Sequence, residues 1–230
     1  MKEEIILGKA DRDEVFRYLG YQGKEPDTKT LLLVEQCEER LLKVAVPRFT
    51  YQVFPILRES SESQIQLDGM AMPLPGTSIR KHLSGCNLAV CMGVTLSEGV
   101  DRAIRIMQLQ DMAKAVIMDT VANVLIEQAC DQTEQIIRKN YPEYYQTFRF
   151  GIGYGDLSIE IQQDFLDAIH AAKRIGLHAT TSSMLMPVKS VTAVIGLSEY
   201  EIKGQARGCQ TCRMQNNCRF REKGGHCNAT

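Results

Sequence analysis

Residues 148 to 155 read Phe-Arg-Phe-Gly-Ile-Gly-Tyr-Gly, with a bulky side chain at every even position. A period of two is that of a β-strand, so the stretch predicts a strand with one bulky face and one face of nearly bare backbone. Strand interiors normally avoid glycine, because glycine packs nothing and loses much entropy on ordering. Three glycines on one face therefore indicate that a flat ligand, or another backbone, approaches closely there. The alternative is a bulged region where a helix packs on the sheet.

Arg149 lies on the same side of this predicted strand as Gly151 and Gly153. Its planar guanidinium can hold a carboxylate or phosphate through two parallel hydrogen bonds. Tyr154 adds a ring face and a hydroxyl at the end of the strand. The alternative to ligand binding is that Arg149 makes an ordinary ion pair on the protein surface. The G-x-G-x-x-G fingerprint of dinucleotide binding is not met, so the glycines alone are a weak indication of a nucleotide.

The rest of the chain predicts helices and strands in uneven order. Apolar spacing and capping residues predict helices from Asp11 or Asp13 to Leu19 and over the ranges 28–42, 77–83, 99–108, 110–139 and 158–175. Alternating or β-branched stretches predict strands in the ranges 44–57, 64–68, 88–96 and 190–197. Pro47 and Pro55 place the first of these at a sheet edge. Because strict βαβα alternation is absent, we expect an α+β fold with a mostly antiparallel sheet.

The long helix predicted over 110–139 carries a polar line. Asn123, Glu127 and Asp131 recur every four residues and share one face. One interpretation is a solvated stripe, and the other is a line of acceptors that faces a cleft.

Composition limits the classes of function. The 230 residues carry 27 Lys+Arg and 28 Asp+Glu, a formal net charge of −1, which disfavours nucleic acid and a membrane surface as bulk partners. No apolar run reaches the roughly 18 residues of a transmembrane helix, and no secretory signal is visible near the N-terminus. We expect a cytoplasmic protein with no membrane partner.

The cysteines fall into two groups. Cys37, Cys86, Cys91 and Cys130 are scattered, and we expect them to be buried as small apolar residues. Four more crowd the last 22 residues with the spacing x2, x5 and x8, at Cys209, Cys212, Cys218 and Cys227. Four thiolates suit zinc or an iron–sulfur cluster, and these residues are the candidate metal ligands. Free thiols or one disulfide are the alternatives. The range 201–230 also has six basic residues against two acidic ones, which could dock an acidic redox protein or simply solvate a surface.

Arg149 to Tyr154 resembles the R-x-x-x-G-Y signature of the activation domain of cobalamin-dependent methionine synthase. Four segments, spread in the expected order from about residue 10 to 197, resemble stand-alone activation-domain proteins. They are Asp13-Glu-Val-Phe-Arg-Tyr-Leu-Gly-Tyr21, Gly76-Thr-Ser-Ile-Arg-Lys-His-Leu83, Gly153-Tyr-Gly-Asp156 and Met186-Pro-Val-Lys-Ser-Val-Thr-Ala193. The chain departs from the fused enzyme after the motif, where Gly155-Asp156-Leu157 replaces a Pro-Ala-Cys stretch.

The resemblance implies a C-shaped domain over residues 1–200, with a twisted, mostly antiparallel sheet and flanking helices, followed by a Cys-rich tail over 201–230. It further implies that S-adenosylmethionine (SAM) lies over the glycine-bearing strand. Arg149 would hold the SAM carboxylate, Gly151 and Gly153 would present backbone groups, and Tyr154 would pack beside the ligand. The family uses an acidic residue toward the ligand's amino group, for which Glu127 is the candidate.

The function implied is that of a SAM-binding reactivation subunit. It would support reductive methylation of the cobalamin on a partner methionine synthase, with flavodoxin or a ferredoxin-type protein as reductant. Because the other synthase modules are absent, the chain would be one component of a methyltransferase system, with no catalytic side chain of its own. The alternative is a zinc- or iron–sulfur-binding redox or interaction module that uses the basic Cys tail.

Overall fold

The computed structural model describes residues 3–21, 24–57 and 63–202, and these residues form two compact units. Among the described residues, unit 1 comprises those in the ranges 1–52, 92–141 and 160–192, and unit 2 comprises those in the ranges 53–91, 142–159 and 193–202. Each unit is thus assembled from three separate stretches of sequence. The four tail cysteines lie outside the described residues.

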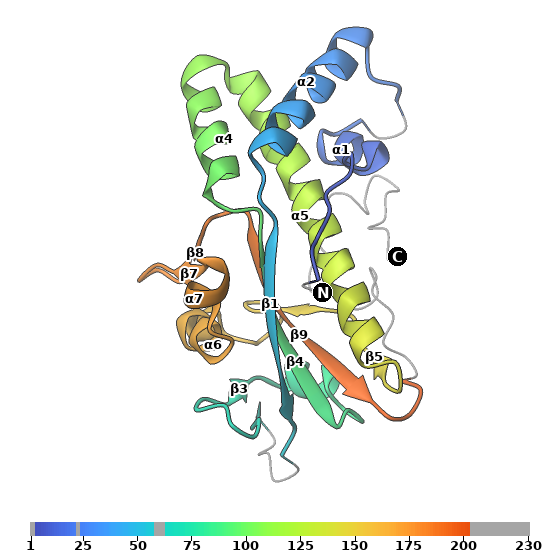
Figure 1. Cartoon of the computed structure of the whole chain (residues 1–230), viewed down its shortest axis with the longest axis vertical. Coiled ribbons are helices and arrows are strands. Elements are labelled where there is room, and N and C mark those ends of the chain that lie inside the picture. The colour runs from blue at the N-terminus through green and yellow to red at the C-terminus, as the bar shows by residue number, and fades with distance from the viewer. Residues whose placement is uncertain (1–2, 22–23, 58–62, 203–230) are drawn as a thin grey trace. The chain divides into compact units, whose positions relative to one another are not determined.

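Unit 1 contains most of the helices (Figure 1). α2 (Thr28–Val44), α4 (Glu98–Gln110) and α5 (Met112–Asn140) pack on one another, and the short α1 (Arg12–Tyr18) packs on α5. Aspartates begin three of these helices: the side chains of Asp11, Asp27 and Asp111 accept hydrogen bonds from backbone N–H groups of the first turns of α1, α2 and α5. These caps satisfy donors that have no partner inside a helix. The N-terminal helix predicted to begin at Asp11 or Asp13 is confirmed, with Asp11 as its cap.

The long strands belong to one sheet. Its order is β1 (Arg48–Pro55), β4 (Leu88–Thr95), β9 (Ser190–Ser198) and β5 (Tyr145–Gln146), and β6 (Phe150–Gly151) also pairs with β9. The boundaries between the units fall within β1, β4 and β9. The pairing of β5 and β6 with β9 is antiparallel, with Tyr145 opposite Ser198 and Phe150 opposite Val194. The predicted fold class, α+β with a mostly antiparallel sheet and flanking helices, is confirmed, as is the edge position of β1, and the sheet is not closed.

Unit 2 also holds a small hairpin-like pair and one helix. β2 (Gln64–Ile65) and β3 (Leu74–Pro75) pair antiparallel, and α3 (Thr77–His82) packs on β2. The predicted inward residues of the 64–68 strand, Ile65 and Leu67, are both buried.

The helix predicted over 158–175 is broken in the structure. It consists of a 3₁₀ turn (η1, Ile159–Ile161), α6 (Gln162–Ala168) and α7 (Ala171–Ile175), with His170 in the left-handed region at φ 54°. Side chains from β1 explain the break: Gln52 Nε2 donates to the Ala168 carbonyl at 2.9 Å and Thr50 Oγ1 to the Ile169 carbonyl at 3.4 Å. α7 is followed by the pair β7 (His178–Ala179) and β8 (Leu185–Met186), which also belongs to unit 1.

Candidate functional site

The glycine-rich stretch in unit 2 is a turn that follows a very short strand. β6 ends at Gly151, and the backbone N–H of Tyr154 donates to the Gly151 carbonyl at 3.1 Å. Gly153 and Gly155 have φ values of 86° and 61°, which side-chain-bearing residues rarely adopt. The predicted strand through residue 155, with its continuous bare face, is therefore wrong. Two of its three glycines are explained by the turn that they make possible.

Asp156 fixes this turn to α3. Its carboxylate accepts hydrogen bonds from the backbone N–H groups of Thr77 and Ser78, at 2.7 and 2.9 Å, and from the Thr77 hydroxyl at 2.8 Å. These hydrogen bonds hold the pKa of Asp156 well below its usual range. A side chain at Gly76 would collide with Asp156, because a Cβ there would lie 2.7 Å from its carboxylate oxygen. Since α3 has no other side-chain cap, Asp156 serves as the cap of its N-terminus.

An aromatic cluster supports the motif. The buried His82 ring lies against Phe148 and Phe150, with ring centroids 4.5 and 5.0 Å apart, and its Nε2 is 2.8 Å from the Thr147 hydroxyl. Tyr154 meets Phe150 edge-on at 5.2 Å while 42% of the Tyr154 residue surface stays exposed. Arg149 is half-buried directly before β6. The turn thus offers a partly exposed aromatic ring, backbone groups and a guanidinium within six consecutive residues.

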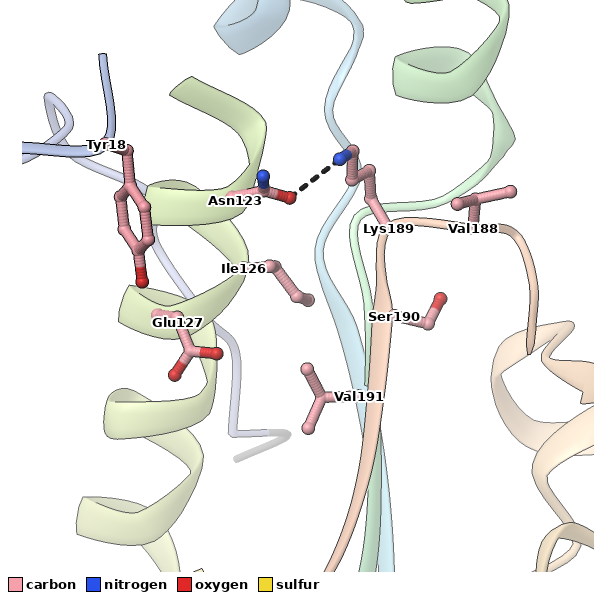
Figure 2. A pocket seen from close by; sticks show the side chains of 8 residues that line it. All are labelled: Tyr18, Asn123, Ile126, Glu127, Val188, Lys189, Ser190 and Val191. Atoms are coloured by element: carbon pink, nitrogen blue, oxygen red, sulfur yellow. Dashed lines mark hydrogen bonds between the residues drawn. The ribbon is translucent and has the colours of Figure 1, made fainter. Parts of the chain in front are cut away.

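Unit 1 contains a cavity of about 380 Å³. It lies between α5 and the start of β9, with Tyr18 of α1 also in its wall (Figure 2). The α5 residues that line it are Asn123, Ile126 and Glu127, and the other lining residues are Val188, Lys189, Ser190 and Val191. Two residues of the predicted polar line, Asn123 and Glu127, thus lie in the wall of this cavity, and Glu127 is also exposed. Asp131, also exposed, is not among the residues that line the cavity.

Lys189 is the most unusual group in this wall, because its side chain is only 9% exposed. Its ammonium Nζ donates to Asn123 Oδ1 at 2.7 Å (Figure 2). It also lies 2.7 Å from Asp119 Oδ1, so the buried charge has an anionic partner. Sequence reasoning did not single out Lys189. The one available signal was a charged residue at the start of an otherwise apolar strand, and its partners on α5 lie far away in sequence.

The backbone around Lys189 is held by α4 and β4. Both carboxylate oxygens of Asp101 on α4 accept backbone hydrogen bonds, from Val188 at 2.5 Å and from Lys189 at 3.2 Å. The hydroxyl of Ser190 donates to Thr95 Oγ1 of β4 at 2.8 Å. This wall of the cavity is therefore built in place by contacts within unit 1.

The residues predicted for the SAM site fall in both units. Arg149, Gly151, Gly153 and Tyr154 belong to unit 2, and Glu127 belongs to unit 1. Their assignment to one ligand stays a prediction.

Three of the four scattered cysteines, Cys37, Cys91 and Cys130, are buried as predicted. Cys86 is only half-buried, so the prediction is not met there, and none of the four is in a disulfide. Burial raises the pKa of Cys37 and Cys91, and that of Cys86 to about 11, so these thiols are protonated at neutral pH. Within the part of the chain that the structure describes, no three His, Cys, Asp or Glu side chains are grouped to hold a metal ion.

Residues 3–21, 24–57 and 63–202 contain no helix that combines the length and the apolar character needed to cross a membrane.

A search of solved structures finds a similar fold. The chain matches a crystal structure of the MetH reactivation domain bound to AdoHcy with a TM-score of 0.62, over 94% of this chain and 82% of that one. The two sequences are 17% identical, so the likeness is one of fold. No protein-family model matches the chain, and no curated protein matches it in sequence.

Proposed function

We propose that this chain is a SAM-binding reactivation subunit of a cobalamin-dependent methionine synthase. The observation that carries the proposal is the fold match to the MetH reactivation domain bound to AdoHcy, which extends over nearly the whole chain. AdoHcy is what SAM becomes when it gives up its methyl group. The R-x-x-x-G-Y motif at Arg149 to Tyr154 gives independent support, because it is a feature of the sequence and does not depend on the fold match.

In this proposal the turn after β6 binds the ligand. The half-buried Arg149 pairs its guanidinium with the SAM carboxylate, and the turn at Gly151 and Gly153 offers backbone groups. Tyr154 provides a partly exposed aromatic ring that meets Phe150 edge-on. Glu127 is the acidic residue that we assign to the ligand's amino group.

The role of this chain in the reaction is to position the methyl donor. When bound on the partner, cobalamin supplies the methyl-acceptor and redox chemistry, and SAM supplies the methyl group. This chain raises the effective concentration of the methyl donor by binding and orienting it, and it needs no general acid or base for that task. The electron comes from flavodoxin or a ferredoxin-type protein, and we expect the complex to act in the cytoplasm.

Isothermal titration of the full chain with SAM tests the assignment. We expect binding to the wild-type chain and a loss of affinity of about 30- to 4,000-fold in Arg149→Ala, which corresponds to about 2–5 kcal/mol for a buried charge pair. Arg105→Ala is the matched control, because Arg105 is an exposed arginine on α4. An unchanged affinity in Arg149→Ala would remove Arg149 from the site. Absence of SAM binding, both alone and with the cobalamin-bearing partner, would contradict the proposed function.

We also propose that Cys209, Cys212, Cys218 and Cys227 bind zinc or an iron–sulfur cluster. The support is the number and spacing of the thiols. Visible absorption of anaerobically purified protein would identify a cluster, and metal analysis would identify zinc. Changing the four residues to serine should abolish the metal content, whereas the control Cys86→Ser should retain it. A metal-free wild-type protein that takes up neither zinc nor iron would refute this proposal.

A further inference from the structure

The short helix α3 contacts both ends of the motif over residues 149–154. Its first residues, Thr77 and Ser78, donate hydrogen bonds to the carboxylate of Asp156, just after the motif. Its last residue, His82, lies against the residues with which the motif begins. The motif is therefore enclosed between two attachments to one helix, and all of these residues belong to unit 2.

The attachment at the start of the motif is aromatic. The buried His82 ring has its centroid 4.5 Å from that of Phe148 and 5.0 Å from that of Phe150. Arg149 stands between these two phenylalanines in the chain. Because both neighbours of Arg149 pack on one ring, the backbone that carries its guanidinium is fixed against α3.

A hydrogen-bond network joins the same ring to the sheet. The Thr147 hydroxyl donates to the Phe148 carbonyl at 3.0 Å and accepts from the Gly196 N–H of β9 at 2.8 Å. It also lies 2.8 Å from Nε2 of His82. A hydroxyl has one hydrogen and two lone pairs, so the three contacts are satisfied together when Nε2 is assigned as a donor. His82 thus links α3 to β9 through Thr147.

The attachment at the end of the motif is a close fit of two backbones. Gly155 has a φ of 61°, and a Cβ on it would lie 2.9 Å from Ser78 Oγ. A Cβ on Gly76 would lie 2.9 Å from the carbonyl oxygen of Asp156. Neither glycine therefore has room for a side chain. The hydrogen bonds of the Asp156 carboxylate hold the turn at this short distance from the start of α3.

We propose that α3 is the positioning element of the SAM site, with His82 and Asp156 as positioning residues that order the turn before the ligand arrives. The inference rests on the proposed function, in which Arg149 and Tyr154 contact SAM. Neither His82 nor Asp156 is assigned a contact with the ligand. A site that is already ordered loses less conformational entropy on binding, so α3 contributes to affinity through the residues that it holds.

Hydrogen exchange of the full chain without ligand tests the ordering of the turn. The reporters are the amides of Tyr154 and Leu157, which donate to the carbonyls of Gly151 and Tyr154. We expect His82→Ala and Asp156→Ala to speed the exchange of these amides about tenfold or more, because each variant removes one attachment to α3.

Phe54→Leu is the matched control. It changes a buried residue of the same unit on β1, which β4 and β9 separate from β6 in the sheet. It should leave the reporter amides unchanged. Asp156 is exposed, so Asp156→Ala decides the outcome if His82→Ala, a change in the core, fails to fold.

Isothermal titration with SAM tests whether this order serves the ligand. His82→Ala and Asp156→Ala should each weaken SAM binding about 10- to 100-fold, which is the cost of ordering about one or two backbone residues on binding. His82→Phe keeps a ring against Phe148 and Phe150, so it should recover most of the affinity lost in His82→Ala. Decarboxylated SAM should lose less affinity than SAM in His82→Ala, because it lacks the partner of Arg149.

The inference is overturned if the reporter amides keep their wild-type exchange rates in Asp156→Ala and in a folded His82→Ala, or if Phe54→Leu speeds them equally. It is also overturned if the amides exchange faster while SAM affinity stays at the wild-type value. A wild-type chain that binds no SAM, alone or with the cobalamin-bearing partner, would instead reject the proposed function. The exchange rates would then still decide whether α3 orders the turn.

Discussion

Asp156 is exposed to solvent, yet its carboxylate makes three hydrogen bonds to the first residues of α3. A carboxylate at a helix N-terminus satisfies N–H groups that the helix cannot pair, and replacing such a cap with alanine costs about 1 kcal/mol. We expect Asp156→Ala to lower the free energy of unfolding by about that amount in urea denaturation at pH 7. Asp68→Ala, a change of an exposed aspartate in the same unit, is the control and should have almost no effect. Equal stabilities of the two variants would contradict the capping role.

The contribution of Asp156 should also depend on pH. Its pKa is lowered in the folded state, chiefly by the hydrogen bonds from Ser78 and Thr77. The folded protein therefore favours the ionised form, and the stabilisation is complete above the unfolded pKa of about 3.9. The stabilisation is lost as the pH falls from the unfolded pKa toward the lower pKa of Asp156 in the folded state. The difference in unfolding free energy between wild type and Asp156→Asn should shrink over that acidic range and stay constant from pH 5 to 7.

Single residues also show what the sequence could not reveal. Glycine does alternate with bulky residues around Arg149, but two of the glycines, Gly153 and Gly155, occupy turn positions with positive φ. A period of two in the sequence cannot distinguish such turn glycines from the bare face of a strand. The role of Lys189 could not be predicted from sequence, because its partners Asp119 and Asn123 are brought to it only by tertiary packing. Asn123 and Glu127 were found because helical spacing alone places them on one face.

The contact of Lys189 with α5 joins the start of β9 to the long helix. Asp119→Ala removes the anion and leaves the buried ammonium of Lys189 with Asn123 as its remaining partner among the described residues. Leaving a buried polar group short of a partner lowers the free energy of unfolding by about 1–3 kcal/mol. Asp119 is half exposed, so we expect a loss near the lower end of this range. Lys189→Met in the same background should restore much of the stability, because the unpaired charge is then absent. The double-mutant cycle from chemical denaturation measures this coupling, and additive effects of the two changes would show that the pair does not interact.

Secondary-structure elements were predictable where their signals are local. The cap at Asp11 and the apolar spacing of the long helices are signals that span only a few residues, and those helices formed as expected. The break between α6 and α7 was not predictable in this way. Thr50 and Gln52 of β1 bind the carbonyls at the break, and they come from more than a hundred residues earlier in the chain.

At the scale of the whole molecule, neither compact unit is a continuous piece of sequence. Each is made from three segments, and β1, β4 and β9 contribute residues to both. The resemblance suggested one domain over residues 1–200, and no sequence pattern indicated where the units divide. The boundary falls inside apolar strands, where composition does not change as it does at a linker.

This shared use of strands leads us to expect one unfolding transition. β1, β4 and β9 each have residues in both units. If one unit unfolds, each of these strands therefore loses its ordered continuation at one end. Calorimetry should therefore give a single peak whose calorimetric and van't Hoff enthalpies agree. Asp119→Ala in unit 1 and Asp156→Ala in unit 2 should both shift that one peak to lower temperature without splitting it. Two peaks, of which each variant moves only one, would show instead that the units unfold independently in spite of their common strands.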